Sequence, residues 1–135
     1  MSLGIGAFAE LINEDETTVH YKYGGFNLND DKYGNEQKIA DGYIVIQKHC
    51  FKEPEIHEKL KRTSSGKKKL VMKRVYVDVD YGGLFEEGSI QIENCSNCWN
   101  VNPDGVDMMA FKLLRKIFDE YQNESKIPAS IFIFS

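Results

Sequence analysis

The sequence has few cysteines and no long apolar run. Its three cysteines are an odd number, which fits poorly with the paired disulfides of a small secreted domain. No apolar stretch approaches the roughly 20 residues of a membrane-spanning helix. Residues 1–10 also lack the basic region and apolar run of a signal peptide. We therefore expect a cytoplasmic protein that has no membrane partner.

A surplus of positive charge is also missing. The chain has 17 Lys and Arg against 21 Asp and Glu, which gives a formal net charge of −4. Nucleic-acid-binding proteins usually carry a basic surplus, because their phosphate contacts displace counterions. This balance argues against a nucleic-acid partner and favours a neutral or basic protein.

Enough apolar residues remain to build a core without disulfides. The chain has 135 residues, of which 41% are hydrophobic and 28% charged, close to ordinary globular values. This length suits one domain. We therefore expect residues 1–135 to form a single domain.

Runs of β-branched and aromatic residues predict an antiparallel sheet. Strand, polar turn and strand over residues 4–23 predict a hairpin, and the alternation of valines in 70–80 predicts another strand. Polar and turn-forming residues predict a loop over 27–41. Further strands are expected at 42–48, 89–93 and 129–134, whereas Tyr81-Gly82-Gly83 is expected to turn the chain.

Two segments favour helices. Pro54 stands at a suitable first helical position, and Ile56 and Leu60 lie four residues apart, which predicts a short helix over 53–62. A long helix is expected to begin near Asn102-Pro103-Asp104 and to carry an apolar stripe from Val106 to Tyr121. The predicted fold is α+β: an antiparallel sheet of about five to six strands, packed against a long C-terminal amphipathic helix, with a shorter helix in mid-chain.

One cysteine motif is compatible with metal binding. Cys95 and Cys98 have the spacing of two zinc ligands, and His49 and Cys50 are the adjacent residues that could complete a site. Adjacent residues of a strand point to opposite faces, which argues against that set. The alternatives are a redox pair or small buried thiols beside Trp99. We expect no bound metal and no cofactor.

Acidic residues in the second half of the chain support two interpretations. Asp78 and Asp80 share one face of the predicted strand, and with Glu93 they could hold Mg²⁺ for phosphodiester chemistry. The same acids could instead form a solvent-facing surface that docks a basic protein. No serine lies in a Gly-x-Ser-x-Gly elbow, so we expect no nucleophilic enzyme.

Three segments resemble small bacterial immunity-type proteins of polymorphic toxin (contact-dependent inhibition) systems. The residues that carry the resemblance are Gly4 to Tyr23, Cys98-Trp99 with Asp104 to Asp107 and Ala110 to Leu114, and Ile117 to Tyr121 with Ile127-Pro128. The middle of the chain, 27–69, is not matched. The resemblance implies a cytosolic protein that neutralises a cognate toxin, and it transfers no binding residue.

The resulting hypothesis is a non-enzymatic toxin inhibitor. Its partner is a cognate protein toxin, with a basic nuclease as the suggested class. The expected contacts are Tyr76, Asp78, Asp80, Glu86 and Glu87. A metal-dependent enzyme and a zinc-stabilised interaction module remain alternatives, and an open sheet edge could pair two copies into a homodimer.

Overall fold

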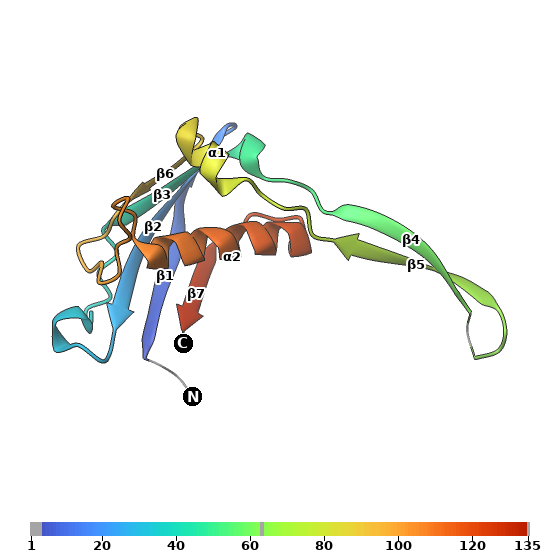
Figure 1. Ribbon diagram of the computed structural model, residues 1–135, viewed down its shortest axis with the longest axis horizontal. Coiled ribbons are helices and arrows are strands. Elements are labelled where there is room, and N and C mark those ends of the chain that lie inside the picture. The colour runs from blue at the N-terminus through green and yellow to red at the C-terminus, as the bar shows by residue number, and fades with distance from the viewer. Residues whose placement is uncertain (1–3, 63, 135) are drawn as a thin grey trace.

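A five-stranded antiparallel sheet forms the body of the molecule, and one long helix crosses one of its faces (Figure 1). The computed structural model describes residues 4–62 and 64–134. The strand order is β6-β3-β2-β1-β7. The bounds are β1 Ile5–Glu14, β2 Thr18–Asn27, β3 Gly42–Gln47, β6 Ile90–Glu93 and β7 Ser130–Phe134.

Helix α2 (Met108–Glu124) supplies the second layer of the core. Its apolar stripe faces alternating strand residues, so Leu113 and Ile117 are fully buried together with Tyr21 of β2 and Ile44 of β3. Each large side chain buried in this way contributes about 1.5–3 kcal/mol. The predicted pairing of sheet and C-terminal helix is confirmed.

The start of α2 differs from the prediction. The helix begins at Met108, where the Asp107 carboxylate caps it by accepting a hydrogen bond from the Met109 N–H at 3.0 Å. The predicted start instead forms a turn: the Asn102 side chain accepts from the Val106 N–H at 2.9 Å, and Gly105 has a φ of +84°. Because this turn uses the Asn102 side chain, the helix starts later, at the next capping acid.

The segment predicted as a helix over 53–62 is instead strand β4 (Glu55–Arg62). It pairs with β5 (Lys68–Val75) in register, Leu60 opposite Leu70. The prediction was wrong because a spacing of four residues fits both periods: Ile56 and Leu60 share one side of a helix and also one side of a strand. The shorter mid-chain helix is present elsewhere, as α1 (Tyr81–Glu86), where a turn was expected.

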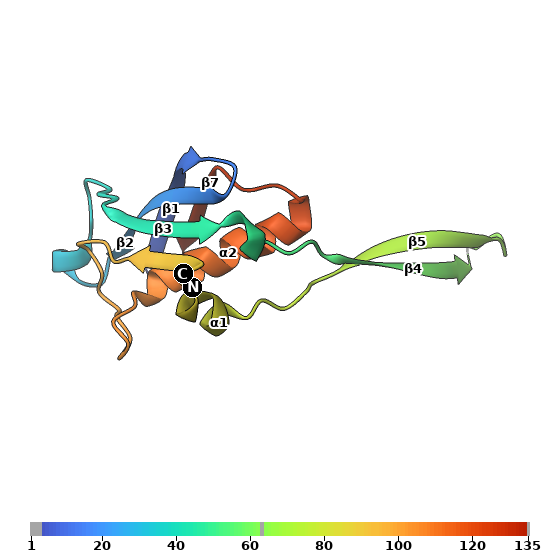
Figure 2. The same cartoon turned by 90° about the horizontal axis from the view of Figure 1, so that it is seen from above.

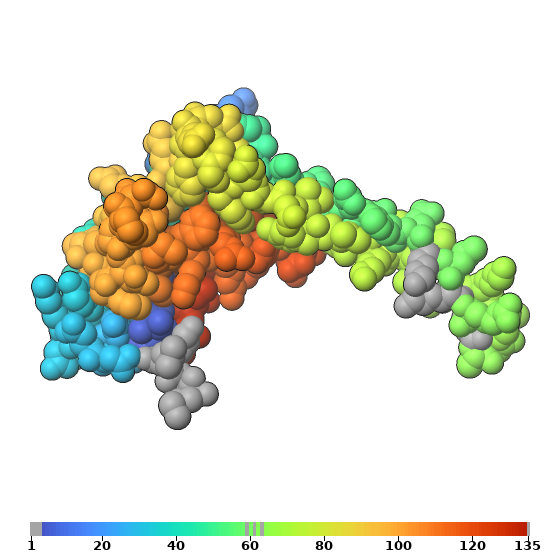
Figure 3. Space-filling model, viewed as in Figure 1, coloured from blue at the N-terminus to red at the C-terminus, as the bar shows by residue number. Residues whose placement is uncertain are grey.

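Strands β4 and β5 form a hairpin that projects far from the body (Figures 1 and 2). We call residues 55–75 the arm. The space-filling view shows the arm standing clear of the sheet and of α2 along most of its length (Figure 3). The strand predicted over 70–80 ends at Val75, and residues 76–80 are an extended link to α1.

Neither helix in the described ranges combines the length and the apolar character that a membrane crossing requires.

Shortening a buried stripe residue tests the role of α2. Leu113→Ala should lower the free energy of unfolding by about 2–5 kcal/mol, because it leaves a cavity between helix and sheet. Lys112→Ala, one residue away on the exposed side, should change it by less than about 0.5 kcal/mol. Urea unfolding followed by circular dichroism measures both, and equal effects would contradict this packing.

Candidate functional site

Acidic residues from three segments lie at the same end of the sheet. Register fixes this arrangement, because Thr18 at the start of β2 pairs with Gln47 at the end of β3, and Ile46 pairs with Ile90 at the start of β6. The β1–β2 turn and α1 therefore lie at the same end, the upper end in Figure 1. We call this region the acidic end; its members are Glu14, Asp15, Glu16, Asp78, Asp80, Glu86 and Glu87.

All five predicted contact residues lie on the surface at or beside the acidic end. Tyr76, Asp78 and Asp80 belong to the extended link that follows β5, and Glu86 and Glu87 lie at the end of α1. The alternation expected for 70–80 continues beyond the end of β5. Tyr76, Asp78 and Asp80 are exposed, whereas the valines between them are partly buried. The turn acids Glu14 to Glu16 were not part of the prediction, because only the pairing of β1, β2 and β3 shows that they lie at the same end of the sheet as α1.

One of the predicted contacts also has a structural role. The Asp80 carboxylate caps α1, where its Oδ1 accepts a hydrogen bond from the Gly83 N–H at 3.2 Å. A Cβ at Gly83 would meet Asp80 Oδ2, so the glycine lets the carboxylate approach this backbone closely. Substituting Asp80 therefore disturbs α1 as well as the surface charge.

The three carboxylates of the metal-enzyme hypothesis are not brought together. Glu93 ends β6 and pairs with Tyr43 at the start of β3, so it lies at the opposite end of these strands from α1. Asp78 and Asp80 precede α1. Within residues 4–62 and 64–134, no three His, Cys, Asp or Glu side chains are grouped so that they could hold a metal ion.

The zinc alternative also divides between two ends of β6. His49 and Cys50 contact Ser89, just before β6, with His49 Nε2 3.2 Å from Ser89 Oγ. Cys95 and Cys98 follow the other end of the strand. The Cys95 thiol is buried and lies 3.8 Å from Asp107 Oδ2, and burial raises its pKa to about 11. Cys95 is therefore a protonated core residue at neutral pH.

A buried polar cluster joins the sheet, the cysteine motif and α2. The Tyr23 hydroxyl donates to Asp107 Oδ2 at 2.9 Å and accepts from the Cys95 N–H at 2.9 Å. Asp107 is only 1% exposed, and burial raises its pKa above the ordinary value, although bonds from Met109 and Tyr23 oppose this. The cluster joins three segments that are distant in sequence, and we assign it a structural role.

The root of the arm is fixed to the C-terminal turn of α2. Gln122, which is 2% exposed, accepts from the Val77 N–H at 2.8 Å and donates to the Val77 carbonyl at 2.7 Å, as a neighbouring strand would. Arg74 donates to the Gln122 and Asn123 carbonyls at the helix end. On the other side of the root, the Tyr121 hydroxyl donates to Glu53 at 2.6 Å.

Charge is divided unequally between arm and body. The arm carries eight Lys and Arg against two Glu, a formal charge of +6, whereas the rest of the chain carries nine against 19, a charge of −10. The total of −4 therefore hides two regions of opposite sign. The body supports the docking of a basic partner, and the arm supports contact with an acidic one.

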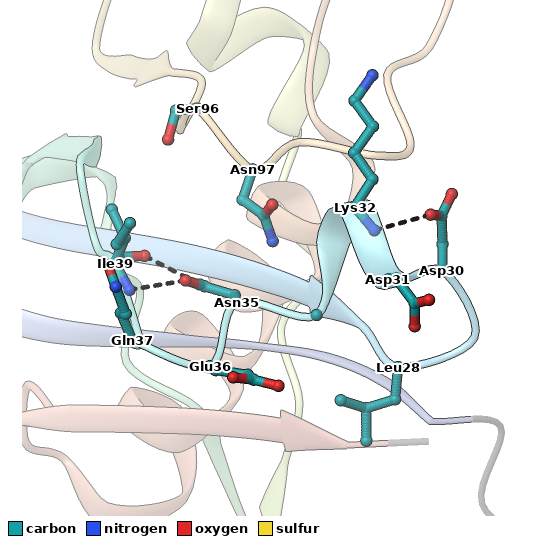
Figure 4. Close-up of a pocket in the computed structure, with 11 residues that line it drawn as sticks. Leu28, Asp30, Asp31, Lys32, Asn35, Glu36, Gln37, Ile39, Ser96 and Asn97 are labelled. Carbon is teal, nitrogen blue, oxygen red and sulfur yellow. Dashed lines mark hydrogen bonds between the residues drawn. The ribbon is translucent and has the colours of Figure 1, made fainter.

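A polar hollow of about 580 Å³ lies under the loop that follows β2 (Figure 4). Its amide groups hold the loop in shape. Asn35 exchanges two hydrogen bonds with the Ile39 backbone at 2.8 and 3.1 Å, and Asn97 donates to the Gly25 and Tyr33 carbonyls. These contacts account for the amides of Asn35 and Asn97, and we assign the hollow no catalytic role.

The raised pKa of Asp107 predicts a pH-dependent stability. The protonated form is favoured in the folded state, so its stabilising contribution is present below the ordinary pKa of 3.8 and is lost as pH rises through the raised value. Relative to Asp107→Asn, the wild type should therefore gain unfolding free energy between about pH 7 and about pH 4. Urea midpoints at several pH values measure the difference, and a difference independent of pH would contradict the assignment.

Removing the side-chain amide of Gln122 should loosen the root of the arm. Gln122→Leu leaves the Val77 N–H and carbonyl without their partner, at a cost of about 1–3 kcal/mol. Faster hydrogen exchange is expected at Val77, with exchange in β1 and β2 nearly unchanged. Asn123→Leu on the exposed side is the matched control, and equal exchange in both variants would show that Gln122 does not hold the arm.

Comparison with protein-family models, curated proteins and solved structures finds no match for this chain. The resemblance to immunity-type proteins therefore stays a hypothesis. The surface charges, the arm and its root provide the observations from which a function is proposed.

Proposed function

We propose that this chain is a cytoplasmic, non-enzymatic inhibitor of the immunity type, which binds and neutralises a cognate bacterial protein toxin. The observation that carries the proposal is the acidic end, where exposed carboxylates from the β1–β2 turn, the link after β5 and α1 lie at the same end of the sheet. The resemblance of both chain ends to immunity-type proteins adds the class of partner.

The charge of the body favours a basic toxin, such as a nuclease whose own substrate is anionic. Excluding the arm, the formal charge is −10, which attracts a cationic surface over several ångströms and accelerates encounter. Glu86 and Glu87 on α1, beside the exposed Tyr76, offer both charge and an aromatic contact. Aromatic and charged anchors of this kind carry most of the free energy at protein interfaces.

Co-expression with the adjacent reading frame tests this function directly. If that frame encodes the toxin, its expression alone should stop growth, co-expression with this chain should restore it, and the two proteins should co-purify. Failure of both rescue and co-purification would remove the proposal for that partner.

Charge reversal tests the acidic end as the contact surface. Glu86→Lys with Glu87→Lys should slow association with the co-purified toxin by about 10- to 1,000-fold and weaken its salt dependence. Glu93→Lys with Asp104→Lys makes the same change of charge at the other end of β6, and should have a much smaller effect. Equal association rates in the two double variants would place the interface elsewhere. Stopped-flow fluorescence measures the rates, and Asp80 is left intact because it caps α1.

A further inference from the structure

The arm has one apolar face. Pairing of Leu60 with Leu70 and of Glu58 with Met72 places the even-numbered residues of both strands on the same side. This side carries four large apolar residues whose exposed fractions lie between 52% and 63%: Ile56, Leu60, Leu70 and Met72. The other four residues of this side are charged: Glu58, Arg62, Lys68 and Arg74. Lys69, Val71 and Lys73 lie on the other side.

An isolated two-stranded hairpin is marginally stable in water unless a further surface covers its apolar face. The body does not provide that surface, because the arm projects away from it (Figures 1 and 3). Gln122 and Arg74 hold the root in this direction. A row of exposed apolar side chains on such an element indicates an interaction site.

Charge selects what can cover the arm. Two arms placed face to face would bring together two charges of +6, whereas the body of a second copy carries −10. The arm and the body are therefore complementary in sign. Since the root directs the arm away from its own body, this complementarity is available between two molecules.

The body also has an exposed apolar surface on which the apolar residues of the arm could pack. On the sheet face opposite α2, Phe26 lies 6.1 Å from Phe132 and 5.9 Å from Phe134 between ring centroids. Phe132 and Phe134 are 57% and 50% exposed. A Cβ at Gly6 would lie 2.4 Å from Phe26 Cζ, so the glycine lets this ring lie flat on the sheet. We call Phe26, Phe132 and Phe134 the aromatic patch.

Charged residues of both signs accompany the aromatic patch. The loop after β2 follows Phe26 directly and carries Asp30, Asp31 and Glu36 against Lys32 and Lys38, all exposed. Lys112 and Lys116 of α2 lie beside Phe132 and Phe134. The loop returns over Gly24, where the Ile39 carbonyl occupies the position that a Cβ would take, at 2.1 Å. An apolar surface beside carboxylates suits an apolar ribbon whose edges carry Lys and Arg.

We propose that two copies of this chain form a dimer by reciprocal exchange of arms. The apolar face of each arm packs on the aromatic patch of the other copy, and the basic residues of the arm face the acids of the adjacent loop. Eight residues of strand span about 26 Å, which exceeds the roughly 19 Å between the outer strands of a five-stranded sheet, so the arm is long enough to lie across the sheet of the other copy. The contact is formed twice about a two-fold axis, so the assembly closes at two copies.

Sedimentation measurements on the full chain test the dimer. The wild type should sediment as a dimer that weakens as salt is raised. Leu60→Ser with Leu70→Ser, an exposed cross-strand pair, should raise the dimer dissociation constant by about 100-fold or more. Val71→Ser, on the same strand but the opposite face, should leave it within about threefold. A monomeric wild type, or a dimer unaffected by the Leu60 and Leu70 substitutions, overturns the proposal.

Mixing two defective variants tests which surfaces meet. Phe132→Ser with Phe134→Ser removes the aromatic patch and should also give a monomer. Mixed with the arm variant, it should form a heterodimer, because its intact arm meets the intact patch of the other chain. Absence of a heterodimer, with circular dichroism showing both variants folded, overturns the arm-to-patch contact.

Two other occupants of the arm give distinct results. If the arm binds nucleic acid, the wild type should be monomeric and should bind a fluorescent 20-base-pair DNA duplex. Its affinity for the duplex should then fall in the variant with Lys69→Gln and Lys73→Gln. If the arm binds a different acidic protein, the wild type should be monomeric and should not bind the duplex. Either result overturns the dimer.

Discussion

The burial of α2 against the sheet is the interaction on which the rest of the structure depends. Its N-terminal cap, Asp107, is tied to β2 through Tyr23, and its last turn holds the arm through Gln122. The same helix therefore completes the core at one end and directs the arm at the other. Loss of its packing would release the root of the arm, although the arm itself lies outside the core.

Sequence patterns predicted those elements whose apolar periodicity has a single interpretation. The stripe of α2 repeats at three and four residues over several turns, and Thr18 to Tyr23 alternates strictly, so both elements were predicted, although α2 begins later than expected. The segment 53–62 was misassigned because two apolar residues four apart satisfy both periods. Its true state depends on pairing with β5, a tertiary contact that no local pattern contains.

The candidate site was predictable only where it follows local rules. Alternation correctly indicated that Asp78 and Asp80 face outward, because the valines between them turn toward the body. That Glu14 to Glu16 lie at the same end of the sheet depends on strand order and could not be inferred. In the sequence Gln122 looks like an ordinary polar residue of a helix. In the structure it is buried, and its side-chain amide makes the two hydrogen bonds that a neighbouring strand would make with Val77. The formal net charge of −4 did not reveal the cationic arm, because it is the sum of an anionic body and a cationic arm.

Attachment at the root alone has an evolutionary consequence for the arm. Leu60, Leu70 and Met72 do not belong to the buried core, so substitutions there should change the free energy of unfolding of the body very little. Selection can therefore diversify the distal half of the ribbon rapidly while α2 and the sheet stay constant. A lineage built on this scaffold would change its binding preferences through a short stretch of sequence, with little risk to the stability of the whole.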